Sequence, residues 1–319
     1  MWRWETLALD PMRSHSTRGY EAWGVVALVM CLIVPKSQAS TNATPAPSSL
    51  RVDVGGYHLH AESRGNGQPT IVIEAASGEA GTRDRSWEVV TAALSRTHRV
   101  FRYDRASLGS SDAPPSLPRT FQDSAEDLHR LLIKAQVPGP YVLVGHSIGG
   151  LIVRCFVDRY PTNVVGMVLV DSSHPAQWAT QGAASSLPSG PLGKPDVQAD
   201  SSQVRPGQPP EEHDLVVGSN QMVRMGKLGD LPLVVLTQGQ RWRLDPTLPE
   251  AITREAEKDW QEWLELQKSL LTLSTRSRHY ISVTGGHYLQ LDDPELVINA
   301  IQGLLAELLK AKSLPHQKP

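Results

Sequence analysis

Cysteine is scarce in this 319-residue sequence, which contains only Cys31 and Cys155. Two distant cysteines cannot build a disulfide framework, and the absence of a CxxC motif or a Cys/His cluster predicts no zinc or other metal site. Charge of one sign is not in excess either, because 31 basic and 33 acidic residues leave a formal net charge of −2 at pH 7. Nucleic-acid binding requires a basic excess or stripe, so we expect no nucleic acid among the partners.

Long apolar runs are also absent, with one exception near the N-terminus. Residues 22–34, AWGVVALVMCLIV, contain no charge. This run is short for a membrane span and suits the apolar region of a signal peptide. Small residues at Ser37 and Ala39 suit a signal peptidase, so we expect residues 1–39 to be cleaved and the chain to be exported, secreted or periplasmic. An uncleaved membrane anchor is the alternative, and residues 40–49 read as a linker.

The region 50–312 alternates short apolar runs with segments of helical periodicity, and a tail of residues 313–319 follows it. Such alternation predicts an α/β fold, with a mostly parallel central sheet flanked by helices. We expect strands at residues 50–54, 57–63, 70–74, 98–103, 141–144, 164–170, 231–237 and 280–284, and helices at 86–95, 121–136, 148–159, 246–273 and 295–309.

One long segment interrupts this alternation. Residues 173–230 are rich in Pro, Ser, Gln and Gly and lie between two of the expected core strands. A loop of this length within a domain is usually a functional lid or a disordered insertion. Its position between core strands favours a lid or cap insertion in the α/β domain.

The most informative motif is GHSIG at residues 145–149, which follows a strand-like run and precedes a helical one. It fits G-x-S-x-G in the strand–turn–helix context that a nucleophilic serine requires. Glycines around the serine leave room for a sharp turn, which raises the Ser147 hydroxyl above the sheet edge. The helix that follows offers free amides and the positive end of its dipole. The motif therefore predicts Ser147 as a nucleophile.

With this motif, four further segments resemble the α/β-hydrolase fold superfamily. They are IVIEAASG at 71–78, YDRASLGSSD at 103–112, VLVDSSHP at 168–175 and GGHYLQLDDPELV at 285–297. The resemblance spans residues 50–309. It implies an α/β-hydrolase fold and a serine hydrolase that uses no cofactor.

The resemblance also implies partners for Ser147. His287 follows a Gly-Gly pair after the last expected strand, where the catalytic histidine of this fold lies, and it would act as the base. For the acid, Asp171 stands at the end of the strand at 164–170, a position that some members use. We expect Asp171 to orient His287. Asp245 is the alternative acid, because it follows the strand at 231–237, although it comes late after that strand.

An acyl-transfer reaction also needs N–H donors for the developing oxyanion. The resemblance implies the backbone N–H of Ile148, directly after the nucleophile, and that of Ser77, with Ala76 as an alternative. We expect His146 to point away from Ser147 and to pack locally.

These residues together predict cleavage of a carboxylic ester through an acyl-enzyme on Ser147. An amidase or aminopeptidase-type hydrolase is the alternative, and its substrate amino group would need acids such as Glu211, Glu212 or Asp214. A non-catalytic ligand-binding protein on the same fold is a further alternative. Fold alone does not distinguish among the three.

Overall fold

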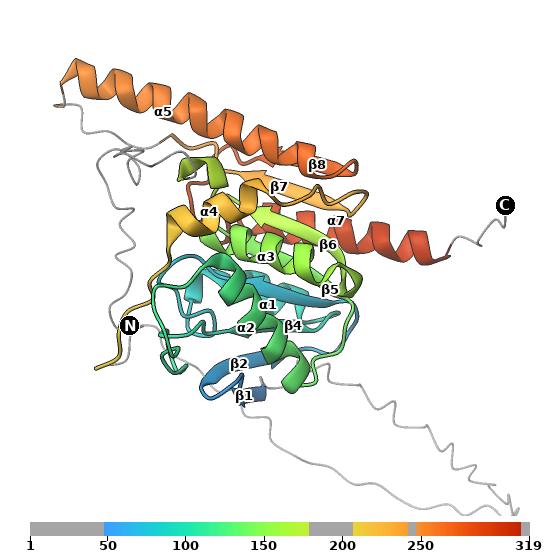
Figure 1. Ribbon diagram of the computed structural model, residues 1–319. Coiled ribbons are helices and arrows are strands. Elements are labelled where there is room, and N and C mark those ends of the chain that lie inside the picture. Colours follow the sequence, from blue (N-terminus) through green and yellow to red (C-terminus); the bar gives the residue numbers. More distant parts are fainter. Residues whose placement is uncertain (1–47, 179–206, 242–246, 248, 314–319) are drawn as a thin grey trace, which may run out of the picture. The chain divides into compact units, whose positions relative to one another are not determined.

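The computed structural model describes residues 48–178, 207–241, 247 and 249–313. Within them lies an eight-stranded sheet in the order β1-β2-β4-β3-β5-β6-β7-β8 (Figure 1). β2 pairs antiparallel with β1 and β4, and all later pairings are parallel, as the alternating sequence predicts. The strands are β1 (Ser48–Asp53), β2 (His58–Arg64), β3 (Thr70–Glu74), β4 (Val100–Tyr103), β5 (Tyr141–His146), β6 (Val164–Val170), β7 (Leu233–Thr237) and β8 (Ser277–Ile281).

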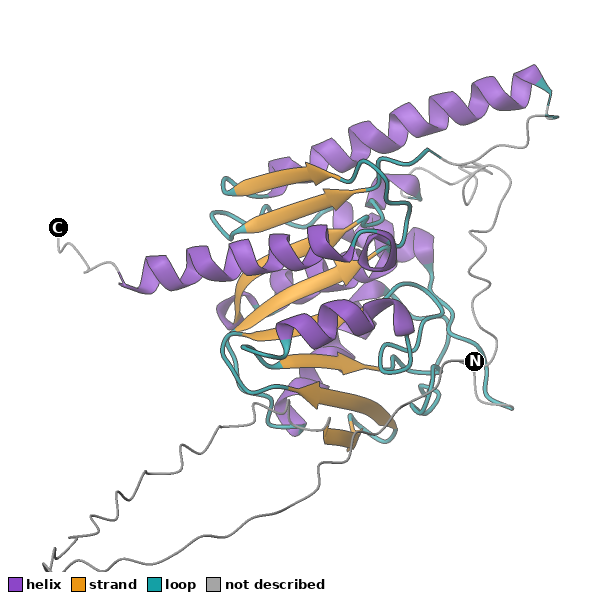
Figure 2. Ribbon diagram, turned by 180° about the vertical axis from the view of Figure 1, so that it is seen from behind, coloured by secondary structure: helices purple, strands orange, loops and turns teal. Residues whose placement is uncertain are grey.

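Helices cover both faces of the sheet (Figures 1 and 2). α1 (Glu88–Leu94) and α7 (Pro294–Ser313) lie on one face, and α2 (Phe121–Lys134), α3 (Ile148–Arg159) and α4 (Leu215–Val223) lie on the other. α5 (Glu250–Ser269) lies beside β7 and β8 at one end of the strand order. Central strands such as β3 and β5 are buried along their whole length, which explains why they are continuous apolar runs.

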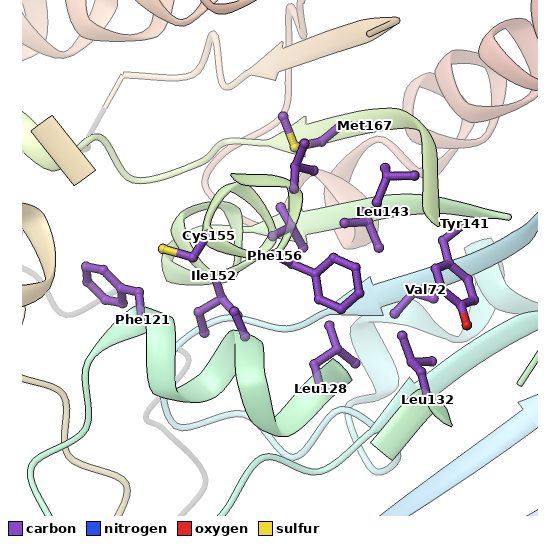
Figure 3. Close-up of a cluster of buried hydrophobic side chains, with 14 of the residues drawn as sticks. Val72, Phe121, Leu128, Leu132, Tyr141, Leu143, Ile152, Cys155, Phe156 and Met167 are labelled. Carbon is purple, nitrogen blue, oxygen red and sulfur yellow. The ribbon is translucent and has the colours of Figure 1, made fainter. Parts of the chain in front are cut away.

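The core between the sheet and α2 and α3 fixes the position of α3, the helix that follows Ser147. Ile152, Cys155 and Phe156 of α3 belong to one buried apolar cluster with Leu128 of α2 and Leu143 of β5 (Figure 3). Cys155 is a free, buried thiol, and burial raises its pKa to about 12, so it acts as a small apolar side chain. A well-packed α3 holds its N-terminus firmly at the sheet edge.

The last strand differs from the expectation. The sequence predicts a strand at 280–284, but β8 spans Ser277–Ile281 and pairs in parallel with β7, with Ser277 opposite Leu233. β8 is an edge strand whose residues are half-buried or exposed, so its polar N-terminal half carries no apolar signal. Ser282 ends the strand, because its hydroxyl accepts from the Gly285 N–H at 2.9 Å and donates to Asp293 at 2.7 Å.

Two further helices were not expected. The described part of the insertion at 173–230 contains α4, which begins at the capping residue Asp214. A short helix, α6 (Leu289–Asp292), precedes α7. Among the residues that the structure describes, no helix has the length and apolar character needed to cross a membrane. The expected signal segment at 1–39 lies outside those residues.

Candidate active site

Ser147 occupies a strained turn between β5 and α3. Its φ is +53°, a value that non-glycine residues rarely adopt. Glycine is required around it, because a Cβ added at Gly149 would lie 2.4 Å from the Glu74 carbonyl oxygen. A Cβ added at Gly145 would lie 2.7 Å from the carbonyl oxygen of Gly149. These close backbone contacts explain why the positions two residues before and two residues after Ser147 must be glycine.

The backbone of Ser147 is tied to the end of the neighbouring strand β6. Its N–H donates to the Val170 carbonyl at 3.2 Å, and its own carbonyl accepts from the Ser173 N–H at 3.0 Å. Asp171 lies between these two partners. The residues expected to be nucleophile and acid therefore sit on directly bonded segments at the carboxyl ends of parallel strands.

Asp171 is fully buried and has a separate partner for each carboxylate oxygen. Its Oδ1 accepts from the Gln238 N–H at 2.9 Å, and its Oδ2 accepts from His287 Nδ1 at 2.7 Å. Burial raises the pKa of this carboxyl, and the contact with His287 opposes that shift. The structure thus brings Asp171 and His287 together. Asp245, the alternative acid, lies outside the described residues.

His146 holds the backbone of His287 in place. His146 Nε2 donates to the His287 carbonyl at 2.8 Å, and the two ring centroids lie 4.8 Å apart. Gln290 Nε2 donates to His146 Nδ1 at 3.2 Å. Burial lowers the pKa of His146 well below its ordinary value, so its ring is neutral. His146 packs locally as expected, but it also braces the loop that carries His287, which sequence reasoning missed.

The loop after β3 contains the N–H groups that were expected to stabilise an oxyanion. Ala76 N–H donates to Glu79 Oε2 at 3.2 Å, and Gly78 N–H donates to Glu211 Oε2 at 2.8 Å. Between them the N–H of Ser77 has no acceptor among the described residues, and neither has that of Ile148 at the start of α3. The side chains of two acidic residues therefore occupy the flanking amides and leave the Ser77 N–H available.

Arg105 ties this loop to the insertion. Its guanidinium donates to the carbonyls of Ala75 at 2.7 Å and Ala76 at 2.5 Å. It also pairs with the buried Glu74 at 2.9 Å and, through two N–H groups, with Glu211 at 2.5 and 2.9 Å. Such a two-point contact is the strongest geometry for an arginine–carboxylate pair. Glu211 of the insertion thereby holds the loop after β3 directly, through Gly78, and indirectly, through Arg105.

Glu79 is a buried acid near the site with a strongly raised pKa. Burial and the neighbouring Asp84 carboxyl raise its pKa to about 8. At neutral pH it is therefore mostly protonated. No sequence pattern marks Glu79 as functional, because a charged residue in a polar, glycine-rich loop is usually solvated.

Two of the three acids considered for an aminopeptidase-type site have other partners. Glu211 is bound by Arg105 and Gly78, and Asp214 accepts from the Val217 N–H at 2.8 Å as the cap of α4. Glu212 is exposed. Within the part of the chain that the structure describes, no group of three His, Cys, Asp or Glu side chains is arranged to hold a metal ion.

Comparisons with known proteins agree with this architecture. A family model described as "Alpha/beta hydrolase family" matches residues 76–301. The Bacillus subtilis protein YqjL is 30% identical over 251 residues, which cover 78% of this chain and 88% of that protein. A protein named probable transporter efuK from Hormonema carpetanum is 38% identical over 130 residues, or 38% of this chain but only 18% of that protein.

Among solved structures, a thermophilic esterase from Thermogutta terrifontis aligns with a TM-score of 0.55. The alignment covers 82% of this chain and 98% of the esterase at 19% identity. At that identity the likeness concerns the fold.

Proposed function

Because the chain belongs to the alpha/beta hydrolase family, we propose that it is a serine hydrolase that cleaves a carboxylic ester through an acyl-enzyme on Ser147. The observation that carries the proposal is the contact of 2.7 Å between His287 Nδ1 and the buried Asp171. Ser147 lies in a strained turn, and its N–H is bonded to Val170, the residue before Asp171. A histidine oriented by a carboxylate is the arrangement that activates a serine hydroxyl.

In the proposed mechanism, Ser147 Oγ attacks the ester carbonyl carbon while His287 Nε2 accepts the hydroxyl proton. Asp171 holds the imidazole with Nδ1 protonated and stabilises the imidazolium that forms. The N–H groups of Ser77 and Ile148 donate to the oxyanion. His287 then gives its proton to the leaving alkoxide, which leaves as an alcohol. Water then attacks the acyl-enzyme while His287 takes its proton. His287 passes that proton to Ser147 Oγ as the acyl–oxygen bond breaks, which releases the carboxylic acid and free Ser147.

Two of the three candidate acids are not free to receive the amino group of a peptide substrate, because Glu211 and Asp214 are already bound within the protein. The exposed Glu212 is the acid that an aminopeptidase-type site would have to use, whereas an ester substrate needs no such acid. Serine at position 147 also argues against epoxide hydrolysis or dehalogenation, which use an aspartate nucleophile at this place in the fold.

The experiment that tests the proposal measures hydrolysis of p-nitrophenyl esters from acetate to palmitate, with Ser147→Ala as the matched variant. We expect turnover by the wild type and a loss on the order of 10⁵-fold or more in kcat in the variant. The preferred acyl length would define the size of the acyl site. Equal turnover by the variant would refute the assignment of Ser147.

We also propose that the chain is exported, with residues 22–34 as the apolar part of a cleaved signal peptide. The N-terminal sequence of the protein recovered from a secreting host tests this. A mature chain that begins at Ser40 is expected, and an intact Met1 in the membrane fraction would favour the anchor.

A further inference from the structure

Arg154 is a buried arginine that the proposed reaction does not use. It lies on α3, about two turns beyond Ser147, and only 8% of its surface is exposed. No hydrogen bond or ion pair joins its guanidinium to any residue that the structure describes, and its Nη1 is buried without a partner. By contrast, the buried Arg105 pairs with two carboxylates, those of Glu74 and Glu211.

The guanidinium keeps its charge despite this burial. Burial lowers the pKa of Arg154 only to about 10, so the group is cationic at neutral pH. The adjacent Cys155 is a neutral thiol and does not compensate the charge. A buried, unpaired cation is strongly unfavourable, and buried charges in proteins are normally paired. An anion beside Arg154 would remove that cost.

A cavity lies where such an anion would bind. It has a volume of about 230 Å³, and Arg154 lines it together with Lys227. Most of its other walls are apolar and come from Val157, Met225, Leu228 and Leu273. Asp158, an exposed residue on the last turn of α3, is its one acidic lining residue and forms no ion pair with Arg154 in the described structure.

This cavity is separate from the Ser147 site. Its walls include the residues that precede β7 and β8, from Met225 to Leu228 and at Leu273. Ser147, Asp171 and His287 instead follow the carboxyl ends of β5, β6 and β8. In parallel strands these are opposite edges of the sheet.

We propose that the cavity binds a small organic monocarboxylate, with its carboxylate on Arg154 and Lys227 and a short apolar tail against the cavity walls. A guanidinium fork matches a carboxylate in geometry and charge. The apolar walls leave a phosphate without enough donors, and Asp158 and the C-terminal end of the α3 dipole disfavour a dianion. The site depends on neither Ser147 nor the proposed ester hydrolysis.

The test is a titration of the full chain, labelled with ¹³C at its methionine methyl groups, with sodium octanoate at constant ionic strength. The Met225 resonance, assigned with Met225→Leu, reports on the cavity, and that of the core residue Met167 serves as the reference. We expect a saturable shift of Met225 and no shift of Met167. Octanamide, which has the same shape without the charge, should produce no saturable shift.

Two arginine variants locate the binding group. Arg154→Leu should weaken the octanoate response at least about tenfold, as loss of a charged hydrogen-bonded contact predicts. Arg159→Leu, which removes a half-exposed arginine from the same helix, should leave the response unchanged. The Met167 resonance and the melting temperature verify that each variant is folded.

Three results would overturn the proposal. They are a Met225 resonance that does not respond to octanoate, a response of equal affinity in Arg154→Leu, and an equal response to octanamide. Inorganic phosphate is the further probe: a saturable shift with phosphate but none with octanoate would exclude the carboxylate class and leave an inorganic-anion site. Since the octanoate and octanamide titrations use the wild-type chain, the test holds even where Arg154→Leu fails to fold.

Discussion

Asp171 is a fully buried acid whose two carboxyl oxygens have different partners. Oδ1 accepts from the Gln238 backbone and so fixes the carboxylate plane, while Oδ2 faces the His287 ring. The φ of Asp171 is +40°, which is strained for a residue with a side chain. A strained, fully buried acid bound to a histidine is more typical of a functional site than of a simple loop cap.

Asp171→Asn tests this carboxylate. Asparagine keeps an oxygen for the Gln238 N–H but offers an amide donor to His287 Nδ1, which imposes the wrong tautomer. In serine hydrolases the equivalent change costs about 10⁴ in kcat, and we expect a loss on that order with little change in melting temperature. Ester hydrolysis by this variant is compared with Asp245→Asn, which should resemble the wild type. The opposite ranking would assign the acid to Asp245.

At the residue scale, the sequence predicts candidate site residues only where they belong to a recognisable motif. Ser147, His287 and Asp171 each follow a strand in a recognisable pattern. Glu79 and His146 have no such signal, because their importance comes from burial and from partners distant in sequence. His146 contacts the loop of His287 across 141 positions of the chain, a pairing that no local pattern encodes.

Among the elements, the insertion is most closely connected to the proposed chemistry. Besides the contacts of Glu211, its main chain joins the segment before α2, because Arg119 N–H donates to the Glu212 carbonyl at 2.9 Å. The Asp214 N–H donates back to the Arg119 carbonyl at 2.8 Å. The part of the insertion around residues 211–214 is thus fixed to the α/β domain by backbone hydrogen bonds.

Glu211→Gln tests whether the contacts of Glu211 with Arg105 and Gly78 support the loop after β3, which contains the proposed oxyanion donor Ser77. Glutamine keeps an acceptor for the Gly78 N–H but removes the charge that pairs with buried Arg105, so the loop should lose its fixed geometry. We expect kcat for ester hydrolysis to fall about tenfold or more, with a smaller change in KM, and a melting temperature several degrees lower. The neighbouring exposed Glu212→Gln is the control. Unchanged kcat in a folded Glu211→Gln variant would show that the contact is only structural.

Element types were predictable where apolar periodicity is strong, as in β3, β6 and α3, whose expected and observed bounds coincide. The prediction was wrong by three residues at β8, because edge strands need not be apolar. It also missed α4, because this nine-residue helix contains three valines and a glycine and shows little helical periodicity.

For the molecule as a whole, the raised pKa of Glu79 predicts how the free energy of unfolding depends on pH. Its folded pKa of about 8 lies above the ordinary value of 4.5, so the folded state holds a proton that the unfolded chain releases. The resulting stabilisation is full below about pH 4.5 and is lost as pH rises to about 8. The free energy of unfolding should fall by up to about 1.4 kcal/mol per pH unit from this residue.

Glu79→Gln removes this titration. Urea unfolding at pH 5, 6, 7, 8 and 9 should give a flatter curve than the wild type, with the variant relatively more stable at pH 8–9. Glu265→Gln, which removes an exposed glutamate on α5, should preserve the wild-type slope. Parallel curves for wild type and Glu79→Gln would mean that Glu79 is ionised in the folded protein at neutral pH.

Covalent labelling tests the central claim, that Ser147 is an activated nucleophile, most directly. The full chain is incubated with a fluorophosphonate probe, and the adduct is located by intact mass and peptide mapping. We predict one adduct per chain, on the peptide that contains Ser147, and none in Ser147→Ala. No adduct, or an adduct on a different serine, would contradict the claim and favour a ligand-binding protein on this fold.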